Sequence, residues 1–193
     1  MSRHRITQPY GPPQEFLDSD WLWSHLPQID RSKGPGADRY RGIVRETVSR
    51  MKLMERSEWN DYGSGLASFF DVWVYRDEPA FRRPRYDKAD HSFAGLWVLM
   101  CRLAPCCVMG EGEKSWSATN GSGYVPTFSG VDRFATKEVA ELAGCVTKHL
   151  STHGLVRLYK GDLAPLLPAD CAFKTNLGDG PLRIFDALFF WND

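Results

Sequence analysis

The chain has 193 residues, of which 42% are hydrophobic and 25% are charged, so it is long enough to form one domain with a sizeable core. Its 24 Lys and Arg residues balance its 24 Asp and Glu residues, and this zero net charge gives no overall electrostatic footprint of binding to nucleic acid or to an anionic membrane. A protein without net charge also self-associates readily, which leaves a homodimer open.

The five cysteines do not suggest a disulfide framework, because their number is odd and Cys106 and Cys107 are adjacent. The N-terminal residues contain no apolar run of the length of a signal peptide, and no stretch approaches the roughly 20 apolar residues of a membrane span. We therefore expect a protein of the reducing cytoplasm.

Residues 1–14 are polar and rich in proline, so we predict a flexible N-terminal segment followed by a single domain over residues 15–193. A first helix is predicted from Asp38, as its N-cap, to about Arg56. The apolar residues of this stretch recur on one helical face: Tyr40, Ile43, Val44, Val48, Met51 and Met54.

Two aromatic and aliphatic runs, Leu66–Arg76 and Phe93–Leu103, predict strands, and the second run continues briefly after Pro105. The sequence GEGEKSWS at Gly110–Ser117 has the composition of a hairpin turn. We therefore expect Glu111 and Glu113 at an exposed turn.

A second helix is predicted over Thr136–His153, with Thr136 as its cap and Gly154 as its stop signal. Its apolar stripe consists of Val139, Ala140, Leu142, Ala143, Val146 and Leu150. The LVRLY sequence that follows, at Leu155–Tyr159, predicts a further strand.

The last stretch, Pro181–Asp193, is apolar on both faces when it is drawn as a strand. Such a strand must be covered on both sides, so we predict a buried C-terminal strand, with a helix as the alternative that a short apolar run leaves open. The elements together predict a single α+β domain with a partly antiparallel sheet, two main helices and this strand in its core.

Cys145, His149 and His153 follow one another at intervals of four residues on the second predicted helix, where two imidazoles on one face are able to bind zinc. No glutamate follows His149 in a metalloprotease pattern, and imidazoles near a helix C-terminus also suit the helix dipole. We therefore predict no metal and no cofactor, and keep these three residues as the candidate ligands.

Cys106 and Cys107, with His91 upstream, are the candidates for a nucleophile and its base, since a cysteine enzyme needs a thiolate beside a base. A free cysteine in an apolar run is more often a small buried hydrophobic residue. No catalytic set is indicated, and we predict that the chain is not an enzyme.

A basic cluster, Arg82, Arg83 and Arg85, alternates with Phe81 and Tyr86, which is a pattern able to contact nucleic acid. Acidic residues on both sides neutralise this cluster, so a solvated loop of mixed charge is the preferred interpretation. We predict no direct contact with nucleic acid.

Four sequences in this order resemble bacterial polymorphic-toxin immunity proteins: GEGEKSWS, the helix ATKEVAELAGCVTKHL, the following GLVRLY and the ending DALFFWND. The resemblance is to the α+β immunity family encoded beside toxins that carry a restriction-endonuclease-like nuclease domain. It covers roughly the C-terminal half of the chain, and residues 1–35 contribute nothing to it.

This resemblance implies a small cytoplasmic protein, without cofactor, that binds its toxin and occludes the active site; type VI secretion is one setting for such pairs. An inhibitor of a basic nuclease is expected to present acidic surface. The candidate toxin contacts are therefore Glu111 and Glu113 around Trp116, with Asp179 in the loop NLGDG.

Packing of Trp116 in the core is the competing interpretation of this group, with the two glutamates only keeping a sheet edge hydrated. Two other functions also stay open. One is a small hydrolase or transferase with a pocket near His91 and Cys106, and the other is a structural adaptor subunit of a secretion-type assembly.

Overall fold

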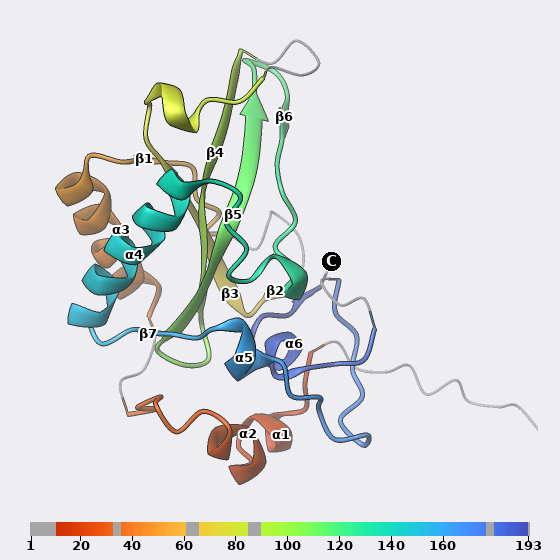
Figure 1. The fold of residues 1–193 in the computed structure, drawn as a ribbon. Helices are drawn as coiled ribbons and strands as arrows, with labels where there is room; N and C mark the ends of the chain where they lie inside the picture. Colours follow the sequence, from red (N-terminus) through yellow and green to blue (C-terminus); the bar gives the residue numbers. More distant parts are fainter. Residues whose placement is uncertain (1–10, 33–35, 61–65, 85–89, 177–179, 193) are drawn as a thin grey trace, which may run out of the picture.

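An antiparallel sheet with two long helices on one of its faces forms the centre of the fold (Figure 1). The computed structural model describes residues 11–32, 36–60, 66–84, 90–176 and 180–192. The prediction of a mixed α+β fold is confirmed, and the sheet is open.

The sheet has six strands in the order β1-β3-β4-β5-β6, and β7 pairs in parallel with the start of β5. Its long members are β3 (Phe69–Tyr75), β4 (His91–Cys101) and β5 (Cys106–Trp116). The edge strands are two residues each: β1 (Met54–Glu55), β6 (Gly121–Ser122) and β7 (Val156–Arg157). Six of the seven residues of β3 are aromatic or β-branched, the seventh is Asp71, and all seven are buried.

The turn predicted at Gly110–Ser117 is wrong, because these residues continue β5 up to Trp116, while residues 102–105 connect β4 to β5. Gly110 and Gly112 are in this strand because aromatic rings lie directly on them, not because the chain turns there. A Cβ atom on Gly110 would lie 2.3 Å from the Trp97 ring, and one on Gly112 would lie 2.4 Å from the Tyr124 ring.

The two predicted helices are present as α3 (Ala37–Met51) and α4 (Lys137–Thr152). Helix α4 matches its prediction, but α3 is shorter than predicted and its N-cap is Gly36, with Asp38 in the first turn. Lys52 adopts a left-handed conformation with φ of 52°, which ends α3 and allows the chain to enter β1.

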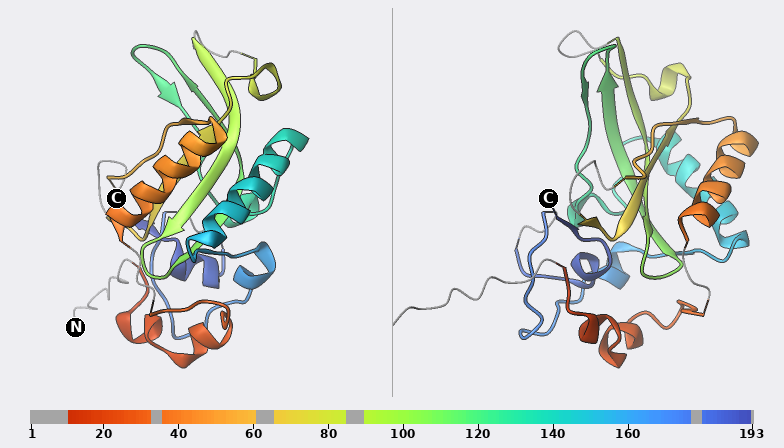
Figure 2. Two further views of the ribbon diagram at one scale, coloured as in Figure 1. Left: turned by 90° about the vertical axis from the view of Figure 1, so that its left-hand side faces the viewer. Right: turned by 180° about the vertical axis from the view of Figure 1, so that it is seen from behind.

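Both helices lie side by side on one face of the sheet (Figure 2, left). Apolar side chains of the helices and of β3 and β4 meet there: Val44, Val48, Val72, Val74, Val98, Met100, Val146 and Leu150. Alternate residues of β3, β4 and β5 therefore point either to α3 and α4 or to the opposite face.

Short elements gather at one end of the sheet (Figure 1). They comprise α1 (Gln14–Leu17), α2 (Asp20–Ser24), α5 (Lys160–Leu163), α6 (Ile184–Leu188), the 3₁₀ turn η3 (Phe128–Gly130), and a second sheet of β2 (Leu66–Ala67) and β8 (Trp191–Asn192). The other 3₁₀ turn, η2 (Pro79–Phe81), lies at the opposite end of the main sheet. Of the predicted flexible segment 1–14, residues 1–10 lie outside the described residues. Gly11 is buried, and its N–H donates to the Lys174 carbonyl (3.1 Å).

The C-terminal segment is buried, as predicted, but the prediction that it forms a strand is wrong for most of its length. Residues 184–188 form α6, and among the described residues of this stretch the strand is limited to Trp191–Asn192. The backbone N–H of Arg183 donates to the Asp186 carboxylate (2.7 Å), which caps α6. Because every residue of α6 is buried, an apolar run without a polar face satisfies a helix as well as a strand.

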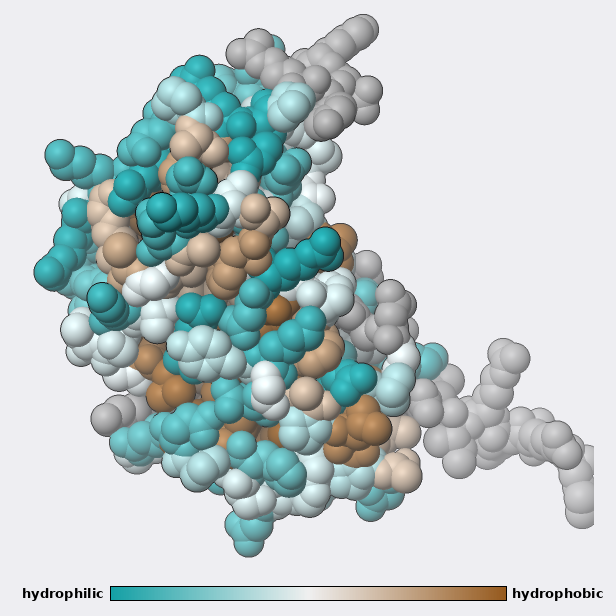
Figure 3. All heavy atoms as spheres, viewed as in Figure 1, coloured by the Kyte–Doolittle hydropathy of each residue, from teal (hydrophilic) through white to brown (hydrophobic). Residues whose placement is uncertain are grey.

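The surface in Figure 3 is mostly hydrophilic, and its hydrophobic residues form separate small patches on that face. Among the described residues, the large exposed hydrophobic side chains come from different parts of the chain: Met54, Leu66, Leu103, Val125, Tyr159 and Leu166. No described helix has both the length and the apolar composition needed to cross a bilayer.

Candidate functional site

The two predicted contact residues Glu111 and Glu113 point to the helix side of β5. Glu111 pairs in register with Leu96, and its side chain is only 7% exposed. Its Oε2 accepts the backbone N–H groups of Ala135 (2.7 Å) and Thr136 (2.9 Å), so Glu111 caps the N-terminus of α4. Glu111 is therefore a structural residue that leaves little carboxylate surface for a partner.

Arg83 joins the two glutamates. Its Nη2 lies 3.4 Å from Glu111 Oε1, and its Nε donates to Glu113 Oε1 (3.2 Å). The Glu113 side chain is 57% exposed, so it is accessible, although part of its charge is already paired with Arg83.

Trp116 lies on the opposite face of β5 from both glutamates, because residues at odd and even positions of a strand alternate between faces. Its ring stacks on His91 and Phe93, with centroid distances of 5.3 Å and 5.7 Å. The predicted arrangement of acids around Trp116 therefore does not form. Asp179, the fourth predicted contact, lies outside the described residues.

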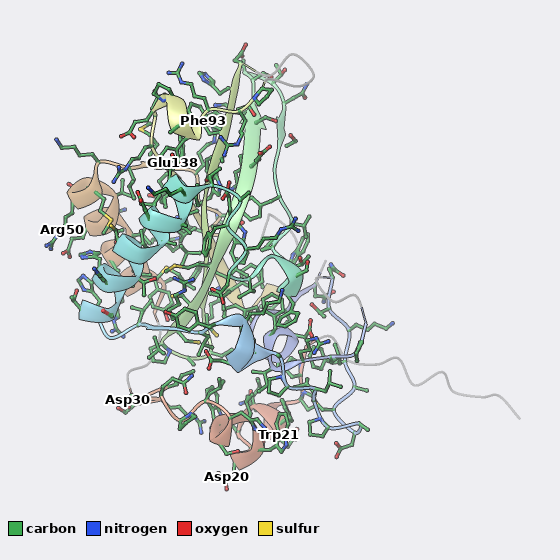
Figure 4. All side chains as sticks on the ribbon, viewed as in Figure 1. Asp20, Trp21, Asp30, Arg50, Phe93 and Glu138 are labelled. Carbon is green, nitrogen blue, oxygen red and sulfur yellow. The ribbon has the colours of Figure 1, made fainter. Side chains whose placement is uncertain are left out.

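Trp116 belongs to what we call the aromatic layer, on the sheet face opposite α3 and α4. The layer consists of Trp73, Tyr75, Phe93, Trp97, Trp116 and Tyr124, and Phe93 marks its position in the upper half of the sheet in Figure 4. Two indole N–H groups fix it to β5: Trp73 Nε1 donates to the Gly112 carbonyl (3.2 Å) and Trp97 Nε1 to the Glu111 carbonyl (3.1 Å).

Two cations cover the aromatic layer. The guanidinium of Arg56, an exposed residue, lies 4.2 Å from the Trp116 ring centroid. Lys114 Nζ lies over the rings of Trp73 (5.4 Å) and Tyr124 (5.2 Å) and donates to the Arg56 carbonyl (3.0 Å). Burial, and then the charge of Arg56, lowers the pKa of Lys114, and Asp71 and Glu58 act in the opposite direction.

An open hollow of about 560 Å³ lies beside these cations and is lined by Glu55, Arg56, Ser57, Glu58 and Lys114. It combines two acidic and two basic side chains. In the view from behind in Figure 2, α3 and α4 lie to the right of the sheet, so both long helices cover the same face and neither lies on the face of the aromatic layer. Trp73, Tyr75, Phe93 and Trp97 are buried. The candidate interaction site is therefore the accessible part of the layer, namely the half-buried Trp116 and Tyr124 with Arg56 and Lys114.

Sequence reasoning found Trp116 but missed Arg56 and Lys114. Lys114 had a visible signal, since it stands two residues before Trp116 and therefore on the same strand face. Arg56 had no such signal. Its side chain reaches Trp116 only because the segment that follows β1 crosses the sheet and approaches β5.

The predicted pairing of His91 with Cys106 does not form. His91 pairs in register with Trp116, and Cys106 lies at the other end of β5, roughly 33 Å away at about 3.3 Å per residue. Cys106 and Cys107 are buried, and burial raises the pKa of Cys107 to about 12. These thiols are core residues and not nucleophiles.

His91 instead lines a polar cavity of about 180 Å³ at the far end of the sheet, together with Asp77, Arg82, Arg83, Asp90, Ser92 and Phe93. Arg82 pairs with Asp77 (3.1 Å) there. The described part of the basic cluster is thus of mixed charge, as its sequence indicates; Arg85 lies outside the described residues.

The three candidate metal ligands separate into two groups. Cys145 is exposed on α4, whereas His149 and His153 point to Glu46 of α3. Glu46 was not a sequence candidate, because only the packing of α3 against α4 brings it there.

Comparison with protein-family models, with curated proteins and with solved structures gave no match.

Proposed function

We propose that this chain is an immunity protein, that is, a protein inhibitor that binds a nuclease toxin and covers its active site. The observation that carries the proposal is the group of Arg56 and Lys114 over the half-buried rings of Trp116 and Tyr124, on the sheet face opposite the long helices. The order of the four sequence motifs in the C-terminal half supports the same function.

The composition of the site favours a protein partner. Interfaces between proteins are enriched in aromatic residues and arginine, and their strongest contacts cluster around such anchors. A site for nucleic acid would instead concentrate positive charge, because phosphate contacts dominate that affinity. Here Glu55 and Glu58 offset Arg56 and Lys114 around the same hollow.

The proposed contacts are therefore Arg56, Lys114 and the half-buried Trp116. Glu111 is not among them, since it caps α4. Glu113 lies on the other side of the strand and would contact the toxin only if the partner wraps around the edge of the sheet.

The test is co-expression with the product of the adjacent gene, with growth as the readout and purification through a tag on this chain. The discriminating variant is Arg56→Glu, which reverses one exposed charge at the site. Its matched control is Arg45→Glu, the same change at an exposed position of α3 on the opposite face. We expect Arg56→Glu to weaken the complex at least about tenfold and to reduce protection, and Arg45→Glu to leave both unchanged.

Thermal unfolding followed by circular dichroism shows whether both variants stay folded. A neighbouring product that neither binds nor harms the cell contradicts the immunity function. A stable complex with a harmless neighbour favours the adaptor function instead. Equal effects of the two charge reversals place the interface elsewhere on the molecule.

A further inference from the structure

Three side chains with metal-binding atoms converge where α3 and α4 lie side by side. Glu46 comes from α3, His149 from the last turn of α4, and His153 is the C-cap residue of α4. One ligand atom from each of the three residues, a ring nitrogen of either histidine or a carboxylate oxygen of Glu46, lies within 4.8 Å of the other two.

The separations do not fit hydrogen bonds. Glu46 Oε1 lies 3.7 Å from His149 Nε2, and Glu46 Oε2 lies 3.5 Å from His153 Nε2. Hydrogen bonds between nitrogen and oxygen are about 2.7–3.2 Å long. A tetrahedral zinc ion with bonds of about 2.0–2.1 Å holds its ligand atoms roughly 3.3–3.4 Å apart, so small side-chain rotations bring the three atoms to that geometry.

Both imidazoles have an unused nitrogen. Nε2 of His149 and Nε2 of His153 are buried and have no hydrogen-bond partner. His149 is only 6% exposed, and a buried polar atom without a partner is costly, so it calls for an explanation. A cation that accepts both lone pairs would satisfy the two atoms at once.

We propose that Glu46, His149 and His153 bind one zinc ion, or a similar borderline divalent cation, that links α3 to α4. Two imidazoles and one carboxylate are a common zinc ligand set. Water would complete the tetrahedron, because the Glu46 side chain is 53% exposed and that of His153 is 27% exposed. Mg²⁺ and Ca²⁺ are not expected, since both prefer oxygen ligands.

The neighbouring charged groups affect the affinity of this site for a cation. Burial, then the neighbouring His153, lowers the pKa of His149, with Glu46 opposing and Arg50 adding to the decrease. The positive charge of Arg50 also opposes a bound cation. Arg39 instead donates to the His153 carbonyl (2.6 Å) and holds this end of α4 in place.

The experiment uses the full chain after treatment with a chelator, and Zn²⁺ or Co²⁺ as the probe. We expect one Zn²⁺ per chain by calorimetry, and a melting temperature higher by roughly 5–10 °C at a free concentration 100 times Kd. Glu46→Gln and His153→Gln change exposed or half-exposed side chains, so both variants should fold, and each should weaken binding at least about tenfold. Cys145→Ser is the control and should bind like the wild type.

Bound Co²⁺ provides a second readout, because it should give the absorption of a tetrahedral site without a thiolate charge-transfer band. The proposal is overturned if the wild type binds no Zn²⁺ at about 100 μM. It is equally overturned if Glu46→Gln and His153→Gln bind like the wild type, or if Cys145→Ser abolishes binding. None of these results depends on the toxin, so they test the metal site separately from the proposed immunity function.

Discussion

At the scale of single residues, Glu111 shows how one carboxylate connects three elements. It belongs to β5, accepts the backbone N–H groups of Ala135 and of Thr136, the N-cap residue of α4, and lies beside Arg83. The N–H groups at a helix start have no partner within the helix, and a nearby anion stabilises both them and the helix dipole.

We therefore expect Glu111→Ala to lower the free energy of unfolding by about 1–3 kcal/mol. Glu113→Ala is the matched control two residues away, where an exposed ion pair contributes about 0–1 kcal/mol. Urea unfolding followed by tryptophan fluorescence measures both. Equal losses in the two variants would show that Glu111 does not stabilise the start of α4.

Asp186 provides a test that depends on pH. Burial raises the pKa of Asp186, while its hydrogen bond from Arg183 and the charge of Arg183 partly oppose this. A folded-state pKa above the unfolded value of about 3.9 means that the protonated form is favoured by folding. The stabilisation that comes from protonated Asp186 is fully present when the pH is below the unfolded pKa, and it is lost as the pH rises through the folded pKa.

Asp186→Asn keeps an oxygen that accepts the Arg183 N–H and removes the charge at every pH. We expect its stability relative to the wild type to increase as pH rises from 3 to 7, because only the wild type must bury an ionised carboxylate at the upper end. Unfolding free energies at several pH values measure the difference. A difference that is constant or decreases with pH would show that burial does not control this carboxyl group.

At the scale of elements, β5 and α6 show where local sequence is insufficient. Glycines in β5 have the composition of a turn, but they are there because indole and phenol rings pack onto the backbone. The apolar run that becomes α6 has no polar face, so its periodicity does not separate a buried helix from a buried strand. In contrast, α4 has both a clear stripe and end signals, and its prediction is confirmed.

The packing of rings on glycine is testable at Gly95, which lies under Trp73 on β4. A Cβ atom there would lie 2.6 Å from the Trp73 ring and 2.7 Å from the Val74 carbonyl oxygen. Since Trp73 is fully buried, we expect Gly95→Ala to lower the stability by about 1–3 kcal/mol.

Gly144→Ala is the opposite case on the exposed side of α4, where an added Cβ meets no atom within 4 Å. It should raise the stability by about 0.5–1 kcal/mol, because alanine favours the helix. Denaturation midpoints of the two variants measure both effects. A Gly95→Ala protein as stable as the wild type would contradict the tight contact between Trp73 and β4.

At the scale of the whole molecule, the fold class and both long helices follow from the sequence, whereas the two candidate sites do not. The cation over Trp116 and the carboxylate beside His149 come from segments distant in the chain. Alternation along a strand and spacing along a helix place Trp116 and the histidines on their faces. These patterns do not show which side chains of other elements pack against Trp116 and the histidines.

The C-terminal residues pack into the core, so their removal tests whether the whole fold depends on them. Leu188, Phe189 and Phe190 are buried, and burial of each such side chain contributes about 1.5–3 kcal/mol. Ser68 also binds this segment, since its hydroxyl donates to the Leu188 carbonyl (2.9 Å) and accepts the Phe190 N–H (2.8 Å).

Truncation after Ala187 should therefore prevent soluble folding, because the lost contribution of roughly 5–9 kcal/mol is comparable to the total stability of a typical domain. Truncation after Trp191 is the control: it keeps these three side chains and, among the described residues, removes Asn192, which pairs with Leu66 at the end of β8. Soluble yield and the circular dichroism melt distinguish the two proteins. If the shorter protein folds and melts like the longer one, the core does not depend on the C-terminal segment, and the contacts of Leu188, Phe189 and Phe190 contribute far less than their burial indicates.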